Sequence, residues 1–178
     1  SAARLRVVDI VFNGVNGGSF RVYATHNSNG SLKERDTVAT VRDREIKDGY
    51  ATGAPFGDFV RRVEIQGAAL LELLTSLKSE GKIVHGYGAS TKGNTLLQYL
   101  EITRHILPAI SDRNEFKWGA RTPGTNIPII SETESREIKP DYYLALPWHF
   151  REGFLRREVE FRARGGKFIF PLPVLEVV

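Results

Sequence analysis

The segment KIVHGYGASTKGNTLLQYLEI, Lys82–Ile102, decides the fold class of this chain. It opens with a short apolar strand, IVHGYG (83–88), that runs into Gly86 and Gly88. Residues 94–101 continue as a helix. A buried strand, a glycine turn and a helix in this order are typical of an α/β protein with a parallel sheet. The segment therefore predicts that fold class, and it raises the question of what the turn binds.

The turn matches neither common phosphate-binding fingerprint. A dinucleotide turn has G-x-G-x-x-G spacing, but here Gly93 follows Gly88 two places late. A Walker loop needs lysine where Asn94 stands, and the lysine is Lys92 instead. A helix N-terminus with a cation still favours an anion. Two interpretations stay open, an anion site and a capped strand–helix turn, and the donors available to either are Ser90, Thr91, Asn94 and Thr95.

Asp112 ends the next strand, 24 residues after Gly88. In a dinucleotide fold an acid at this place accepts a hydrogen bond from a ribose hydroxyl. An aspartate at a strand end also commonly caps a turn. Both interpretations apply to Asp112.

The rest of the chain is expected to form a β-hairpin and a long amphipathic helix, followed by alternating strands and helices. This pattern predicts an α/β, Rossmann-like, mainly parallel sheet with helices on both faces. Residues 1–54 would form the hairpin and a connecting segment, and residues 55–178 the Rossmann-like domain, together one compact unit of a larger enzyme. The expected elements are strands 5–13 and 18–26, a short helix near 36–48, a helix from Phe56 to about Ser79 capped by Gly81, a strand at 105–112, a loop at 113–130, a strand at 141–148, a helix at 149–166 and a strand from 167.

The composition is that of a soluble globular protein, with 178 residues, 41% hydrophobic and 26% charged. The absence of cysteine excludes disulfides and thiolate zinc sites, and it fits a cytoplasmic protein. A net charge of +4 is spread along the chain, which argues against a nucleic-acid partner. No apolar run approaches the roughly 20 residues that span a bilayer. Because the chain contains no Met, we expect a piece of a longer protein.

Five motifs occur in an order that resembles one family. They resemble the C-terminal domain of S-adenosylmethionine-dependent sugar C-methyltransferases, which act on nucleotide-linked deoxysugars. The resemblance covers nearly the whole chain, is most specific at GYGASTKGNTLL and PGTNIPI, and is weakest at residues 27–54. The motifs are NGGSFRVY (16–23), GYGASTKGNTLLQY (86–99), SDRNEFKWGARTPGTNIPI (111–129), KPDYYLALPWHF (139–150) and GGKFIFPLP (165–173).

The resemblance implies a division of labour. An upstream methyl-donor domain of the same polypeptide would bind S-adenosylmethionine and carry the base that forms an enolate beside a ketone. This chain would bind no cofactor or metal of its own and would help to position a dTDP-type nucleotide sugar in the keto-deoxysugar form. The isolated chain is therefore not expected to transfer a methyl group.

The resemblance also assigns site residues. No catalytic residue is expected in this chain, with His149 as a candidate for proton transfer against a capping or surface role. The family loop carries a basic residue where Ala120 stands here, and it often has Asn where His149 stands. Trp148 either stacks on a base or packs in the core. The substrate-binding candidates are Ser19, Arg21, Lys92, Asn94, Thr95, Asp112, Lys117, Arg121 and Trp148.

Two other functions stay open. Gly86, Gly88 and Asp112 are compatible with a stand-alone Rossmann-like protein that binds a dinucleotide. The apolar stripe from Phe59 to Leu77 is compatible with a ligand-free structural or oligomerisation domain, as core or as an interface between domains.

Overall fold

The computed structural model describes residues 3–178. The chain forms two compact units, Ser1–Arg62 and Val63–Val178. The boundary falls inside the long helix α2, Ala54–Ser79, so this helix contributes to both units.

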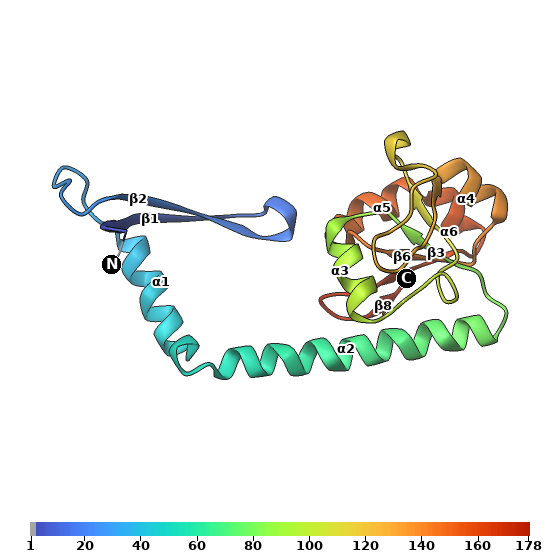
Figure 1. Ribbon diagram of the computed structural model, residues 1–178, viewed down its shortest axis with the longest axis horizontal. Coiled ribbons are helices and arrows are strands. Elements are labelled where there is room, and N and C mark those ends of the chain that lie inside the picture. The colour runs from blue at the N-terminus through green and yellow to red at the C-terminus, as the bar shows by residue number, and fades with distance from the viewer. Residues whose placement is uncertain (1–2) are drawn as a thin grey trace. The chain divides into compact units, whose positions relative to one another are not determined.

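The first unit consists of a hairpin and a helix. Strands β1 (Leu5–Asn13) and β2 (Ser19–His26) pair antiparallel, as the sequence predicts. A bulge between Val7 and Asp9 shifts the register. Helix α1 (Asp36–Lys47) follows and lies beside the open end of the hairpin (Figure 1). The short helix predicted near residues 36–48 is thereby confirmed.

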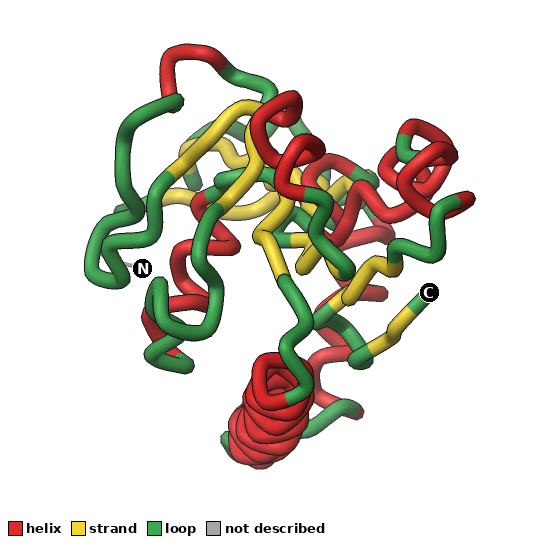
Figure 2. Tube along the Cα trace, turned by 90° about the vertical axis from the view of Figure 1, so that its right-hand side faces the viewer, coloured by secondary structure: helices red, strands yellow, loops and turns green. Residues whose placement is uncertain are grey.

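Helix α2 is continuous, as its end-on view in Figure 2 shows. Gly81 follows it with φ +73°, and the Lys82 amide donates to the Leu77 carbonyl, which is a glycine cap. The predicted helix and its cap are confirmed. Its apolar stripe divides, because Leu70, Leu74 and Leu77 are buried whereas Phe59 and other residues of its first half are exposed. No helix among residues 3–178 combines the length and the apolarity needed to cross a membrane.

The second unit is built on a six-stranded sheet with the order β5-β4-β3-β6-β7-β8. Neighbouring strands run parallel, except that β8 runs antiparallel to β7. Counted from β3, this is the 3-2-1-4-5-6 order of dinucleotide-binding folds, and the predicted fold class is confirmed. The strands are β3 (Val84–Tyr87), β4 (Ile110–Asp112), β5 (Ile129–Ser131), β6 (Tyr142–Ala145), β7 (Lys167–Phe170) and β8 (Glu176–Val177).

Helices cover both faces of this sheet because alternate strand residues point to opposite sides. One face is aliphatic: Leu144 and Ile169 pack with Leu74 of α2 and Leu97 of α3 (Thr91–Tyr99). The other face is aromatic. In Figure 1 the helices of the aromatic face lie above the strands and α2 lies below them. The aromatic face joins Tyr87, Tyr143, Phe168 and Phe170 to Phe154 of α5 (Arg151–Arg157) and Phe161 of α6 (Val159–Ala163), and α4 (Glu132–Ile138) lies beside them.

Several sequence-based boundaries are wrong. The strand expected at 141–148 keeps only Tyr142–Ala145, and the helix expected from residue 94 begins at Thr91. The strand expected at 105–112 keeps only Ile110–Asp112, because Pro108 cannot donate to a ladder. The expected loop at 113–130 contains the start of β5, a strand of three residues that is too short to show alternation. The helix expected at 149–166 is interrupted at Glu158, whose φ of −99° and ψ of 43° are not helical.

Candidate functional site

The glycine turn lies where the connections of the sheet diverge. From the end of β3 the chain passes through α3 to β4 on one side, while β6 pairs with β3 on the other. Ligands of open α/β sheets bind in the crevice at such a point. Gly88 has φ +83°, and a Cβ there would lie 2.8 Å from the Pro147 ring. Glycine is therefore required both for the backbone conformation and for contact with the end of β6.

The start of α3 is capped and tightly packed. Ser90 Oγ accepts a hydrogen bond from the Gly93 amide at 3.0 Å. A Cβ on Gly93 would lie 2.5 Å from Leu146 Cβ, so the helix sits directly on the end of β6. Lys92 is exposed beside this cap. The capped-turn interpretation is confirmed, whereas anion binding stays a prediction.

Both carboxylate oxygens of Asp112 accept hydrogen bonds from groups of the same chain. Its Oδ2 accepts from the Ala89 amide at 2.7 Å and from Lys117 Nζ at 3.1 Å, and its Oδ1 accepts from the Asn114 amide at 2.8 Å. Lys117 Nζ also donates to the Ala89 carbonyl at 2.8 Å. The buried carboxylate thus fastens the loop after β4 to the glycine turn. This geometry favours turn capping over ribose binding.

Trp148 and His149 lie in a short turn (Trp148–Phe150) directly after β6. Trp148 is half-buried and packs against the aromatic cluster. Burial lowers the pKa of His149, and the Lys92 ammonium lowers it further. His149 Nδ1 is buried and has no hydrogen-bond partner within residues 3–178. The structure therefore brings Lys92 and His149 together at this edge of the sheet.

The other candidates have simpler surroundings. Asn94 is half-buried in α3, and the exposed Thr95 donates to the Thr91 carbonyl at 3.2 Å. Arg121 is exposed and donates to the Asn126 carbonyl at 3.2 Å.

The two hairpin candidates belong to the first unit. Ser19 Oγ donates to the Val15 carbonyl at 2.9 Å. The exposed Arg21 guanidinium donates to the Tyr23 hydroxyl at 3.4 Å. Neither of these local contacts buries its polar group, so both remain accessible on the hairpin surface.

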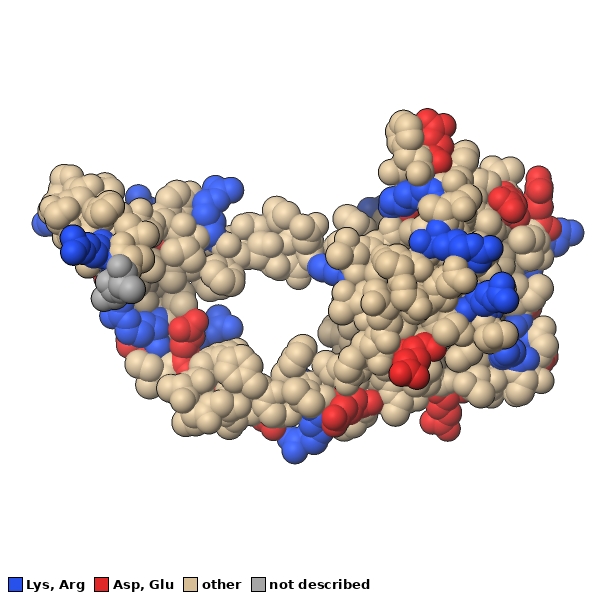
Figure 3. Space-filling view, viewed as in Figure 1, with Lys and Arg blue, Asp and Glu red and all other residues tan. Residues whose placement is uncertain are grey.

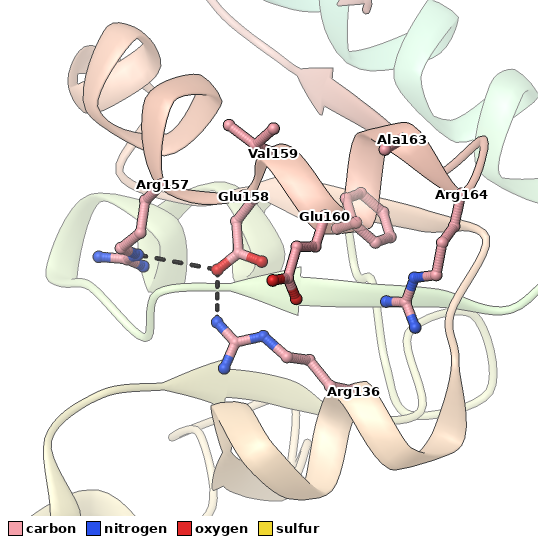
Figure 4. A pocket seen from close by; sticks show the side chains of 8 residues that line it. Arg136, Arg157, Glu158, Val159, Glu160, Ala163 and Arg164 are labelled. Carbon is pink, nitrogen blue, oxygen red and sulfur yellow. Dashed lines mark hydrogen bonds and ion pairs between the residues drawn. The ribbon is translucent and has the colours of Figure 1, made fainter.

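A cluster of charged side chains around the buried Glu158 was not predicted from the sequence. Glu158 Oε1 accepts from the Tyr87 hydroxyl at 2.7 Å. It also accepts from Arg136 at 2.5 Å (Figure 4). Arg157 donates to the Tyr87 hydroxyl and to Glu132 Oε1, the latter at 2.7 Å. Each carboxylate thus meets an arginine, and the cluster links α4 and α5 to β3.

The cluster keeps a buried carboxylate ionised. Burial raises the pKa of Glu158, but hydrogen bonds from Arg136 and Tyr87 outweigh it and the pKa is lowered. Burial also raises the pKa of Tyr87, and its bond to Glu158 raises it further. The sequence did hold a signal: Glu158 falls between Phe154 and Phe161 at helical spacing, on the apolar side.

The crevice at the divergence of the strands is small. It holds about 140 Å³ and is lined by Gly88, Pro147, Phe150 and Arg157 among others. Sites for cofactor-sized molecules are roughly 300–1,000 Å³. A larger open hollow of about 850 Å³ lies beside the charge cluster, but Arg136 and Arg157 in its wall are already paired with carboxylates.

The arrangement of metal-ligating and charged side chains shows which kinds of site the second unit could hold. Among residues 3–178 no group of three or more His, Asp or Glu side chains is placed to hold a metal ion. Basic and acidic side chains occur together on the face of the second unit seen in Figure 3. The distinctive feature is therefore the glycine turn with its exposed helix N-terminus.

The sequence model of the C-methyltransferase C-terminal domain matches residues 14–173. The chain belongs to this family. It is also similar to the C-methyltransferase NovU of Streptomyces niveus, with 36% identity over 174 residues. The similar region covers 98% of this chain and 41% of NovU, so the chain spans about two fifths of the length of this relative. The family that the ordered motifs indicated is confirmed as that of C-methyltransferase C-terminal domains.

Proposed function

We propose that this chain is the substrate-facing C-terminal domain of an S-adenosylmethionine-dependent C-methyltransferase that acts on a nucleotide-linked keto-deoxysugar. The observation that carries the proposal is family membership over residues 14–173. It is supported by the glycine turn, which presents a helix N-terminus and a lysine where open α/β sheets bind ligands. The domain's task is to hold the sugar nucleotide in one orientation.

Three residues of α3 are assigned to the diphosphate of a dTDP-type substrate. Lys92 supplies a cation, and Asn94 and Thr95 supply polar groups in the first turns of the helix. Arg21 of the hairpin has a planar fork that matches a phosphate or a sugar hydroxyl pair, with Ser19 two residues before it.

The remaining candidates act around this contact. Asp112 and Lys117 enter the proposal through the loop that they fasten to the glycine turn. Arg121 adds a further exposed cation, and Trp148 offers an aromatic surface after β6. His149 is a candidate for moving a proton. Burial and the neighbouring Lys92 ammonium lower its pKa, which favours the neutral imidazole that can accept a proton.

Two observations on the second unit support the proposal that the methyl donor binds outside this chain. The crevice of about 140 Å³ encloses neither an adenosine-bearing cofactor nor a whole nucleotide sugar, so the proposal assigns only the diphosphate to this edge of the sheet, at the exposed start of α3. Both oxygens of Asp112, the residue placed to receive a ribose, are occupied within the chain. The proposal therefore places S-adenosylmethionine and the enolising base in the upstream domain of the same polypeptide.

Titration of the intact enzyme with dTDP tests the site. Lys92→Ala and Arg21→Ala should each weaken binding by about tenfold or more, because each removes a charge-assisted contact. Arg104→Ala removes another exposed cation from the second unit and should leave the affinity unchanged. Unchanged affinity and turnover in both the Lys92 and Arg21 variants would remove the assignment.

The strand order favours a second candidate, a domain that binds a dinucleotide by itself. Calorimetry of the chain with NAD, NADP and FAD separates the two functions. Micromolar affinity for one of these molecules would support the second candidate, and the occupied Asp112 carboxylate favours the first.

A further inference from the structure

The first unit buries very little of itself. Among residues 3–62, Val8, Asp9 and Val38 are the buried residues. A domain of about 60 residues that folds alone buries roughly 60% of the surface its unfolded chain exposes. Three buried side chains fall far short of such a core, so the unit lacks part of its packing.

The missing packing lies on one face of the hairpin. Cross-strand partners share a face, and the register pairs Phe12 with Phe20, Ile10 with Val22 and Val7 with Ala24. These six residues are apolar, and the pair Leu5–His26 lies on the same face at the open end of the hairpin. The other face alternates with it and is mixed, as the pairs Val11–Arg21 and Asn13–Ser19 show. The hairpin is therefore amphipathic across its thickness, like a strand pair at the surface of a core.

Helix α1 covers only half of the apolar face. Val38 and Val41 of α1 line a groove with Val7 and Ile10, near the open end of the hairpin. Asp9 anchors the helix there, because its carboxylate accepts from Thr37 Oγ1 at 2.7 Å and pairs with Arg35 at 3.2 Å.

The half near the turn is bare. Phe12 is 60% exposed, Phe20 65% and Val22 45%. The two phenylalanine rings contact each other, with centroids 6.2 Å apart, and thus form one continuous patch. Exposed clusters of large apolar residues on otherwise polar elements mark interaction surfaces.

The strand edges lead to the same conclusion. In the part of the chain that the structure describes, β1 and β2 pair with each other alone, so each has an open outer edge. A single two-stranded hairpin is at best marginally stable in water, and long open edges are normally covered.

The family boundary indicates what covers the patch. The match to the C-terminal domain begins at residue 14, in the turn between the strands, so β1 lies outside it and β2 inside. NovU is more than twice as long as the region it shares with this chain. The hairpin thus lies where a family member passes from its C-terminal domain into the rest of its polypeptide.

We infer that the patch of Phe12, Phe20 and Val22 packs against the methyl-donor domain of the same polypeptide and completes that domain's core. This inference rests on the proposed function, which supplies the donor domain. The hairpin then belongs structurally to the donor side, although β2 belongs to the C-terminal family by sequence. Arg21, on the opposite face of β2, would thereby be held in a fixed position at the junction of the two domains.

Hydrogen exchange measured by mass spectrometry tests the inference. Amides of β1 and β2 should exchange at least about 100-fold more slowly in the full-length polypeptide than in the 178-residue chain. Phe12→Ser with Phe20→Ser in the full-length polypeptide should bring their exchange close to that of the 178-residue chain. Phe116→Ser, a matched change at a 90% exposed residue of the second unit, should leave hairpin exchange unchanged. Slow exchange in β3 and β6 verifies that each variant is folded. If the double serine variant does not fold, Phe20→Ala is the milder replacement.

Each outcome decides the point. Equal hairpin exchange in the two polypeptides would overturn the inference. Protection in the 178-residue chain that rises with its concentration would also overturn it, because the occupant would then be a second copy. Protection by the full-length polypeptide without dTDP binding would leave the hairpin contact standing and would remove the proposed function alone.

Discussion

The two units of this chain differ in how much of their apolar surface they bury. In the second unit both faces of the sheet are covered, and Phe168 has no exposed surface. In the first unit a comparable aromatic residue, Phe20, is 65% exposed on a sheet of two strands. Phenylalanine therefore packs in a buried core in the second unit and lies on an exposed face in the first. The second unit therefore covers the apolar residues of its sheet, whereas the first unit leaves an apolar face of its hairpin exposed.

The largest change in the free energy of unfolding is expected when a phenylalanine of the second unit, rather than one of the first, is replaced by alanine. Phe168→Ala should lower the free energy of unfolding by about 3–5 kcal/mol, because it leaves a cavity among Tyr87, Tyr143 and Phe154. Phe20→Ala should lower it by less than about 0.5 kcal/mol in the isolated chain. Urea unfolding followed by near-ultraviolet circular dichroism measures both. Phe168→Leu serves if the alanine variant does not fold, and similar losses at both positions would break the comparison.

The next effect is a pH dependence of stability that arises from a buried histidine of the second unit. His85 is buried, its Nδ1 lies 2.8 Å from Ser135 Oγ, and burial lowers its pKa to about 4. The unfolded chain takes up this proton near pH 6.5 and the folded chain does not, so stability is complete above pH 6.5 and falls toward pH 4. The loss from pH 7 to pH 4 should be about 3 kcal/mol. Urea unfolding at both pH values measures it.

The contribution of His85 is obtained by difference, because carboxylates titrate in the same range. In His85→Gln the fall in stability between pH 7 and pH 4 should be smaller by about 3 kcal/mol. An unchanged pH profile in this variant would show that His85 does not sense pH.

The smallest expected difference in stability is between two ion pairs, one in each unit. Glu158→Gln removes a buried charge that Arg136 and Arg157 share, and it should cost about 2 kcal/mol, less than the 3–5 typical of fully buried pairs, because the arginines are partly exposed. Glu34→Gln removes the exposed partner of Arg42 in the first unit and should cost about 0.5 kcal/mol or less. Thermal unfolding of both variants measures the difference, and a larger loss for Glu34 would contradict the comparison.

Much of the architecture was predictable because it rests on local patterns. The run 83–88, the glycines and the following helix identified the parallel sheet, and the stripe through Leu70, Leu74 and Leu77 identified α2. Strands of three residues, such as β5, show no periodicity, so their pairing with a neighbour defines them rather than their own sequence.

For the candidate site, too, local motifs located some residues, while the contacts of others became known only from the fold. The expected helix from residue 94 placed Asn94 and Thr95 where the structure has them, whereas Lys92 was expected in the turn and lies in the first turn of the helix. The sequence left two roles open for Asp112, and only the fold shows its carboxylate bound to the Ala89 amide. The contacts of Glu158 with Tyr87, 71 residues away, were likewise outside the reach of any local pattern.

Local patterns and motif order were sufficient to predict the fold class, the long helix, the glycine turn and the family. These depend on periodicity, on backbone conformations that glycine favours, and on motif order, all of which are properties of neighbouring residues. Tertiary structure alone decided which polar groups are already satisfied and which apolar face is uncovered. Both are properties of packing between distant segments, and only the folded chain reveals that the Asp112 carboxylate accepts hydrogen bonds within the chain while Phe12 and Phe20 stay exposed.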